Sequence, residues 1–126
     1  IGTINLMRGG IMYDQKDIVL IHFPYSDLTE SKKRPALIIS NDKINKMQDR
    51  ICCLITTQAH KDDLPITKDS FKEGILPFKS FVKPHRIFTI HESIIIKKLC
   101  TINDKFHDKV IEKLNEYIQK IVFDEN

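Results

Sequence analysis

The chain has 126 residues, which is enough for one domain with a sizeable core and too few for two domains of ordinary size. Of these residues, 41% are hydrophobic and 29% are charged, a composition typical of a globular protein and not of a disordered or fibrous one. The net charge of +3 permits an anionic partner but is too small to identify a nucleic-acid-binding protein by itself.

The three cysteines form no recognisable disulfide or metal motif. Cys52 and Cys53 are adjacent in an apolar run, and Cys100 stands alone. No pair has C-x-x-C spacing, so we expect buried free thiols and a reducing, cytoplasmic location. No apolar run approaches the roughly 20 residues that cross a bilayer, and the N-terminus lacks the apolar core of a signal peptide.

The N-terminal end differs from the rest of the chain. It shows no hydrophobic period, and an Arg-Gly-Gly sequence interrupts it. Met7 and Met12 each offer a natural start. We therefore expect residues 1–11 to be a leader or a cloning remnant outside the fold, and residues 12–126 to form a single domain.

Short strands are predicted to follow one another along most of the chain. Residues 17–23, 36–40 and 51–57 are apolar runs rich in β-branched side chains. Between the second and third runs, residues 42–48 are expected to form a short helix. Weaker strand candidates are residues 64–67 and 70–71. Further short strands are expected at residues 80–82 and 87–90, and residues 94–99 contain another.

A single long helix is predicted at the C-terminal end, from Asp104 to about Val122, with Asn103 or Thr101 as its cap. Many short strands followed by one amphipathic helix predict a mainly β fold, in which a small curled antiparallel sheet packs one face against the helix. The apolar stripe of the helix consists of Phe106, Val110, Leu114, Tyr117, Ile118, Ile121 and Val122.

Motifs for phosphate-binding loops, H-E-x-x-H zinc sites and paired-cysteine sites are absent from the sequence. The five histidines share no ligand spacing, and each alone is more typical of a surface or half-buried residue than of a ligand. The sequence therefore predicts neither a metal site nor a cofactor.

Arg34 stands where a polar loop meets an apolar strand. Pro35 follows it, which disfavours a helical conformation at Arg34 and presents its side chain at the mouth of the strand. A guanidinium carries five donors in a planar fork that matches phosphate oxygens. Position alone leaves two interpretations open, a phosphate ligand or a surface arginine paired with Asp27 or Glu30.

Thr56, Thr57 and Gln58 close the third predicted strand. Threonines at a strand end are usually explained by β-propensity alone. A hydroxyl beside an arginine can, however, hydrogen-bond a phosphate whose charge the arginine neutralises. If a 2′-hydroxyl is held in line with that phosphorus, positioning and charge stabilisation bring RNA cleavage within reach.

Three blocks in order resemble the MazF/PemK family of bacterial toxins, the endoribonucleases of type II toxin–antitoxin pairs. They are DIVLIHFPYSDLTESKKRPALIISND, ICCLITTQ and SFVKPHRIFTIHESIIIKKL, and the third matches the PemK-like branch. The match extends over essentially residues 17–122. It implies an SH3-like small barrel of the PemK/CcdB type, homodimeric, that cleaves single-stranded RNA without a metal. The implied activity is that of a sequence-specific mRNA interferase, which forms a 2′,3′-cyclic phosphate and inhibits growth.

The resemblance also assigns residues. It makes Arg34 and Thr56 catalytic. The sequence departs from the family pattern in two ways. The loop of residues 24–33 has no glycine, whereas many members carry glycines there, and Phe88 stands where many members carry an arginine. Phe88 is expected to be a core residue or else a stacking platform for a base. The expected RNA contacts are Ser26, Thr29, Lys33, Thr57, Gln58, Lys83, His85 and Arg86.

The resemblance leaves the general base unassigned. Because arginine stays protonated, His85 and His22 are the neutral-pH bases to test. Two other functions remain open from the sequence, a CcdB-like toxin that poisons gyrase without catalysis and an RNA-binding barrel that has lost catalysis. The intact RPALII sequence argues against the first.

The resemblance implies two protein partners. One is a second copy of the chain, and the other is a cognate antitoxin whose acidic, partly disordered C-terminal segment lies across the RNA groove. DNA would be contacted only through the antitoxin, and no membrane is involved.

Overall fold

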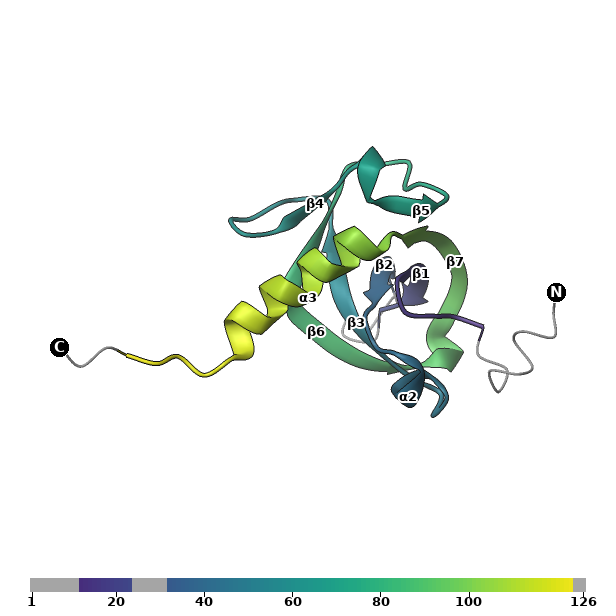
Figure 1. Ribbon diagram of the computed structural model, residues 1–126. Coiled ribbons are helices and arrows are strands. Elements are labelled where there is room, and N and C mark those ends of the chain that lie inside the picture. The colour runs from purple at the N-terminus through teal and green to yellow at the C-terminus, as the bar shows by residue number, and fades with distance from the viewer. Residues whose placement is uncertain (1–11, 24–31, 124–126) are drawn as a thin grey trace.

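The computed structural model describes residues 12–23 and 32–123, which form a curled antiparallel sheet with one long helix across it (Figure 1). The predicted leader of residues 1–11 lies outside this described part. The sheet has seven strands in the order β4-β6-β3-β2-β1-β7-β5, which confirms a mainly β fold with a C-terminal helix. The strands are β1 Asp17–His22, β2 Lys33–Ile38, β3 Asp49–Thr56, β4 Leu64–Ile66, β5 Phe71–Glu73, β6 Ser80–His91 and β7 Ile95–Ile102. The helical elements are α2 Asp42–Asn45, η1 Lys68–Ser70, η2 Glu92–Ile94 and α3 Asp104–Ile118, of which η1 and η2 are single 3-10 turns.

The strong strand predictions are confirmed with shifted boundaries. β2 begins at Lys33 and not at residue 36, because pairing with β1 draws Lys33 and Arg34 into the ladder opposite His22 and Ile21. The helix α2 ends at Asn45, short of the predicted residues 42–48, and Gln48 has a φ of 73° that no α-helix accommodates.

The two short strands predicted at residues 80–82 and 87–90 are one continuous strand, β6. Its register with β3 shifts between the pair Cys53–Ile87 and the pair Leu54–Lys83. Residues 84–86 therefore form a bulge, which accommodates Pro84 without ending the strand.

Two hydrophobic cores lie on opposite faces of the sheet, because side chains alternate along each strand. The helix-side core packs under α3 and consists of Ile18, Leu37, Ile39, Cys53, Ile55, Val82, Cys100, Ile102, Phe106, Val110 and Leu114. The second core consists of Val19, Ile21, Ala36, Ile38, Cys52 and Ile90. All three cysteines are buried and free, as the sequence predicts.

The helix α3 is shorter than the sequence predicts. Asn103 caps it, accepting a hydrogen bond from the N–H of Phe106 at 2.8 Å, but it ends at Ile118 and not near Val122. Its last apolar residues leave the core, and Ile118 is 66% exposed. Figure 1 shows why, since the C-terminal segment extends beyond the sheet. In the described residues no helix is long and apolar enough to cross a membrane.

Arg50 is a fully buried cation at the start of β3. Its guanidinium donates to the carbonyls of Tyr13 at 3.0 Å and Asn45 at 2.8 Å, and to the Glu92 carboxylate at 3.2 Å. It also donates to the carbonyl of Asp49. Arg50 thus connects the segment before β1, the helix α2 and the turn η2.

We expect Arg50→Ala to lower the free energy of unfolding by about 3 kcal/mol or more, because buried carbonyls lose their donor and a cavity remains. Urea unfolding followed by circular dichroism measures the difference. The exposed Arg86, changed to Ala, is the matched control and should alter stability by less than about 0.5 kcal/mol. An Arg50→Ala protein as stable as the control would contradict the structural role of Arg50.

Candidate functional site

Arg34 lies on β2 at the edge of the second core. It pairs with Ile21 of β1, and alternation places it on the same face as Ala36 and Ile38. The β2–β3 ladder begins at Ala36, directly after Pro35, which has no N–H to donate. The half-buried Arg34 is therefore held in an extended strand, as the sequence predicts, with its side chain beside an apolar cluster.

An aromatic pair supports the Arg34 side chain. Its guanidinium lies over the ring of Phe23, 5.7 Å from the centroid, and Phe23 meets Phe88 edge to face at 5.6 Å. Phe88 packs against the second core, which is the first of its two expected roles. This cation–π contact holds the guanidinium beside the aromatic pair.

Thr56 is the half-buried last residue of β3. Its Oγ1 accepts a hydrogen bond from the backbone N–H of Gln58 at 3.1 Å. The β2–β3 ladder pairs Ala36 with Leu54, and continuing this register by two residues places Arg34 opposite Thr56. Opposite residues on neighbouring strands share a face and have Cβ atoms about 5 Å apart. The fold thus brings the two predicted catalytic residues to adjacent positions.

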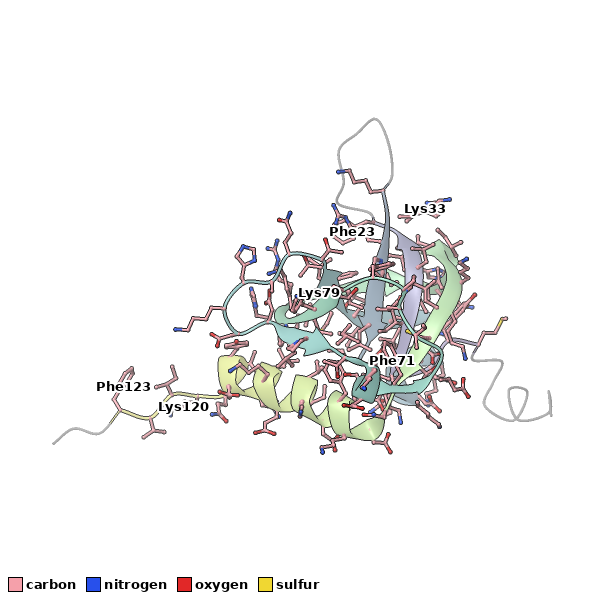
Figure 2. The ribbon with its side chains drawn as sticks, turned by 90° about the horizontal axis from the view of Figure 1, so that it is seen from above. Phe23, Lys33, Phe71, Lys79, Lys120 and Phe123 are labelled. Carbon is pink, nitrogen blue, oxygen red and sulfur yellow. The ribbon has the colours of Figure 1, made fainter. Side chains whose placement is uncertain are left out.

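The other predicted RNA contacts near this pair are dispersed. Thr57 and Gln58 are exposed and follow β3 directly. Lys33 is exposed at the start of β2, at the same end of the sheet as Phe23 in Figure 2, but alternation turns it to the face opposite Arg34. The predictions for Ser26 and Thr29 lie outside the described residues.

Lys83 is held in an ion pair. Its Nζ lies 2.8 Å from Oδ2 of Asp63, whose side chain is only 1% exposed, and 3.0 Å from Nδ1 of His60. Burial tends to raise the pKa of Asp63, but the hydrogen bonds from Lys83 and from the His60 N–H outweigh it and hold that pKa below its usual value. Lys83 therefore stabilises the loop before β4, and this contact competes with its predicted contact to RNA.

Neither histidine proposed as a base joins Arg34 and Thr56. His85 lies in the bulge of β6, and its ring meets Tyr117 of α3 edge to face at 5.9 Å, next to the helix that covers the opposite core. His22 pairs with Lys33 and so lies on the face opposite Arg34. Arg86, also in the bulge, is exposed.

Phe81 is not among the predicted site residues, yet the β3–β6 ladder places it directly opposite Thr56. The Nζ of Lys79 lies 5.8 Å from the centre of its ring. The alternation of Phe81 with its neighbours Ser80 and Val82 indicates that it faces away from them. No sequence signal indicates which residue of β3 it opposes, because the bulge shifts the register.

The three cysteine thiols add no reactive group to the site. Burial raises the pKa of Cys52 and of Cys53 to about 12 and that of Cys100 to about 11, so these thiols stay protonated and unreactive at neutral pH. Within residues 12–23 and 32–123, no group of three or more His, Cys, Asp or Glu side chains is arranged to hold a metal ion. The arrangement instead offers a cation, a hydroxyl and aromatic surfaces.

Comparison with known proteins shows the family to which the chain belongs. A family model described as "PemK-like, MazF-like toxin of type II toxin-antitoxin system" matches residues 14–118. A search of curated proteins found no match.

Solved structures share the fold at low sequence identity. An endoribonuclease in complex with its cognate antitoxin from a mycobacterial species has a TM-score of 0.64 at 16% identity, covering 82% of this chain and 89% of the other. MazF from Deinococcus radiodurans has a TM-score of 0.63 at 16% identity, covering 87% and 98%. The Mycobacterium tuberculosis toxin MazF-mt6 has a TM-score of 0.62 at 16% identity, covering 79% and 93%.

The Asp63–Lys83 pair makes stability depend on pH. The pKa of Asp63 is lower in the folded chain than in the unfolded chain, where it is about 4. Its carboxylate therefore stabilises the fold at pH values above the unfolded-state pKa. This contribution is lost as the pH falls through the folded-state pKa. We therefore expect Asp63→Asn to be less stable than wild type at neutral pH, with a difference that shrinks as the pH falls below about 4.

Urea unfolding of both proteins across this pH range measures the difference. Asp62→Asn is the control, because the Asp62 carboxylate is half-exposed and lies 3.9 Å from Lys113. A difference between Asp63→Asn and wild type that does not change with pH would contradict the ion pair.

Proposed function

Because the chain belongs to the PemK-like, MazF-like toxin family of type II toxin–antitoxin systems, we propose that it is a cytoplasmic toxin that cleaves single-stranded RNA without a metal ion. The observation that carries this proposal is the β2–β3 register, which pairs Ala36 with Leu54. Continued by two residues, this register places Arg34 opposite Thr56, where a cation and a hydroxyl can meet one phosphate. The names of the similar structures, which include an endoribonuclease, support the same reaction class.

The proposed reaction is an attack of an RNA 2′-hydroxyl on the adjacent phosphorus. The bond from the 2′-oxygen to phosphorus forms as the bond from phosphorus to the 5′-oxygen breaks, which yields a 2′,3′-cyclic phosphate and a free 5′-hydroxyl. The 2′-proton leaves to a base and the 5′-oxygen gains a proton.

In this reaction Arg34 stabilises charge and does not act as the base, because an arginine guanidinium stays protonated in proteins. Its in-plane N–H groups would donate to the non-bridging oxygens, where negative charge grows in the transition state. The Thr56 hydroxyl would hold the same phosphate in line with the 2′-oxygen.

Exposed polar residues around the pair would guide the RNA strand. We propose that Thr57, Gln58 and Arg86 contact it, since each is exposed at the end of β3 or in the neighbouring bulge. We also propose contacts to the strand from Ser26 and Thr29, and from Lys33 at the start of β2.

We expect Arg34→Ala and Thr56→Ala each to slow RNA cleavage about 100- to 1000-fold, the usual cost of removing one group that stabilises transition-state charge. Cleavage of a long RNA in EDTA, with the cut sites mapped, measures the rate. Lys43→Ala, which removes an exposed lysine of α2, is the control and should cut like wild type. Intact RNA with the wild-type protein, or an Arg34→Ala protein as fast as the control, would overturn the proposed nuclease.

We also propose that the protein forms a homodimer through the exposed apolar surface beside α3. Ile87 of β6 is 45% exposed, and at the end of α3 Tyr117 is 43% and Ile118 is 66% exposed. Exposed apolar patches of this kind mark interaction sites. Sedimentation that finds only a 14.7 kDa species would exclude this dimer.

The second proposed partner is an antitoxin whose acidic segment covers the RNA site. The name of one similar structure includes its cognate antitoxin, and Arg34 offers a cation to which an acidic side chain can bind. We expect a peptide from the acidic end of the neighbouring gene product to inhibit RNA cleavage competitively, and more weakly as salt screens the charges. A peptide that binds but leaves cleavage unchanged would contradict a shared site, and a charge-matched scrambled peptide is the control.

A further inference from the structure

Phe81 is a half-buried aromatic residue without a place in either core. Among the described residues, it belongs neither to the helix-side core nor to the second core, and it is not one of the partly buried residues that pack against them. Its neighbours Ser80 and Val82 are buried on the other side of β6. Within the described part of the chain, packing against either core therefore does not explain why this ring is present.

The sheet places this ring beside the proposed catalytic pair. The β3–β6 ladder puts Phe81 opposite Thr56, and the β4–β6 ladder puts Pro65 opposite Phe81. Residues directly opposite in a sheet share one face. Arg34, Thr56 and Phe81 thus form a row across β2, β3 and β6, with strands about 5 Å apart.

The ring already holds a cation. The Nζ of Lys79 lies 5.8 Å from its centroid, and Lys79 is exposed and has no acidic partner among the described residues. Lys83, two residues beyond Phe81, is by contrast held by the buried carboxylate of Asp63. A lysine over an exposed ring is bound more weakly than a nucleobase that stacks there. A base can therefore displace Lys79, whose ammonium then lies near the phosphates.

We propose that Phe81 is a stacking platform for an unpaired RNA base next to the phosphate held by Arg34 and Thr56. This inference rests on the proposed function, because it takes single-stranded RNA as the occupant. Every base has a π-face, so the platform contributes affinity and position without selecting a base by itself. Lys79 completes the subsite by pairing with the strand's phosphates.

The experiment compares Phe81→Leu with Phe81→Tyr. Leucine keeps an apolar side chain but removes the aromatic face, whereas tyrosine keeps the face. Binding of a labelled single-stranded RNA is measured by fluorescence anisotropy in EDTA, in the Thr56→Ala background so that the RNA stays intact. The same two changes are made in the protein with Thr56 present, and KM and kcat are measured.

We expect Phe81→Leu to weaken RNA binding about tenfold or more and to raise KM, while Phe81→Tyr stays within about twofold of its parent. Phe123→Leu is the control for loss of an exposed ring, because Phe123 lies far from Lys79 on the C-terminal segment in Figure 2. Thermal unfolding of each variant separates weaker binding from weaker folding.

Each outcome decides between the proposals. If Phe81→Leu binds RNA as tightly as its parent, or if Phe81→Leu and Phe81→Tyr lose the same affinity for RNA, the stacking role of Phe81 is wrong even if the protein cleaves RNA. If RNA binding depends on the Phe81 ring but the protein with Thr56 does not cleave RNA, the proposed nuclease activity is wrong and the stacking role of Phe81 stands. A protein that binds no single-stranded RNA would overturn both.

Discussion

Antiparallel pairing of β2 with β3 and of β3 with β6 gathers Arg34, Thr56 and Phe81 on one face, and they share that face only in the observed register. A shift by one residue would turn every side chain of a strand to the other face. Such a shift would also move the side chains of one core to the side of the other, because the adjacent residues Cys52 and Cys53 belong to cores on opposite faces. The packing that stabilises the sheet thus fixes the geometry of the site.

Arg50 explains how β3 is held in that register. It begins the strand that Thr56 ends, pairs with Ile90 of β6, and donates to Tyr13, Asn45 and Glu92. Its cost of burial is offset only where these acceptors surround it, so an alternative pairing would leave a buried cation without partners. A single buried side chain at one end of the strand therefore favours the register that positions the other end.

The sequence predicts best what depends on local alternation, and least what depends on register. The apolar runs predict the strands β1 and β3, and the capping preference of asparagine predicts the cap at Asn103. The proline that follows Arg34 predicts its extended conformation. The continuity of β6 does not follow, because a bulge lets the strand pass through Pro84. The placement of Phe81 opposite Thr56 depends on that bulge, and the ion pair of Lys83 with Asp63 depends on how the loop before β4 folds. Both are long-range contacts that no local pattern encodes.

The aromatic residues on the site face suit a reaction that relies on one cation. The guanidinium of Arg34 lies over the ring of Phe23, and Phe88 meets Phe23 edge to face, so packing holds the guanidinium beside this aromatic pair. A preorganised charge needs little reorganisation when the phosphorane forms, and an apolar neighbour lowers the local dielectric in which that charge acts. Phe88 supports Phe23 by packing and adds no second charge beside Arg34. In the proposed reaction, the Phe23–Phe88 pair therefore helps to position the guanidinium that stabilises the transition state.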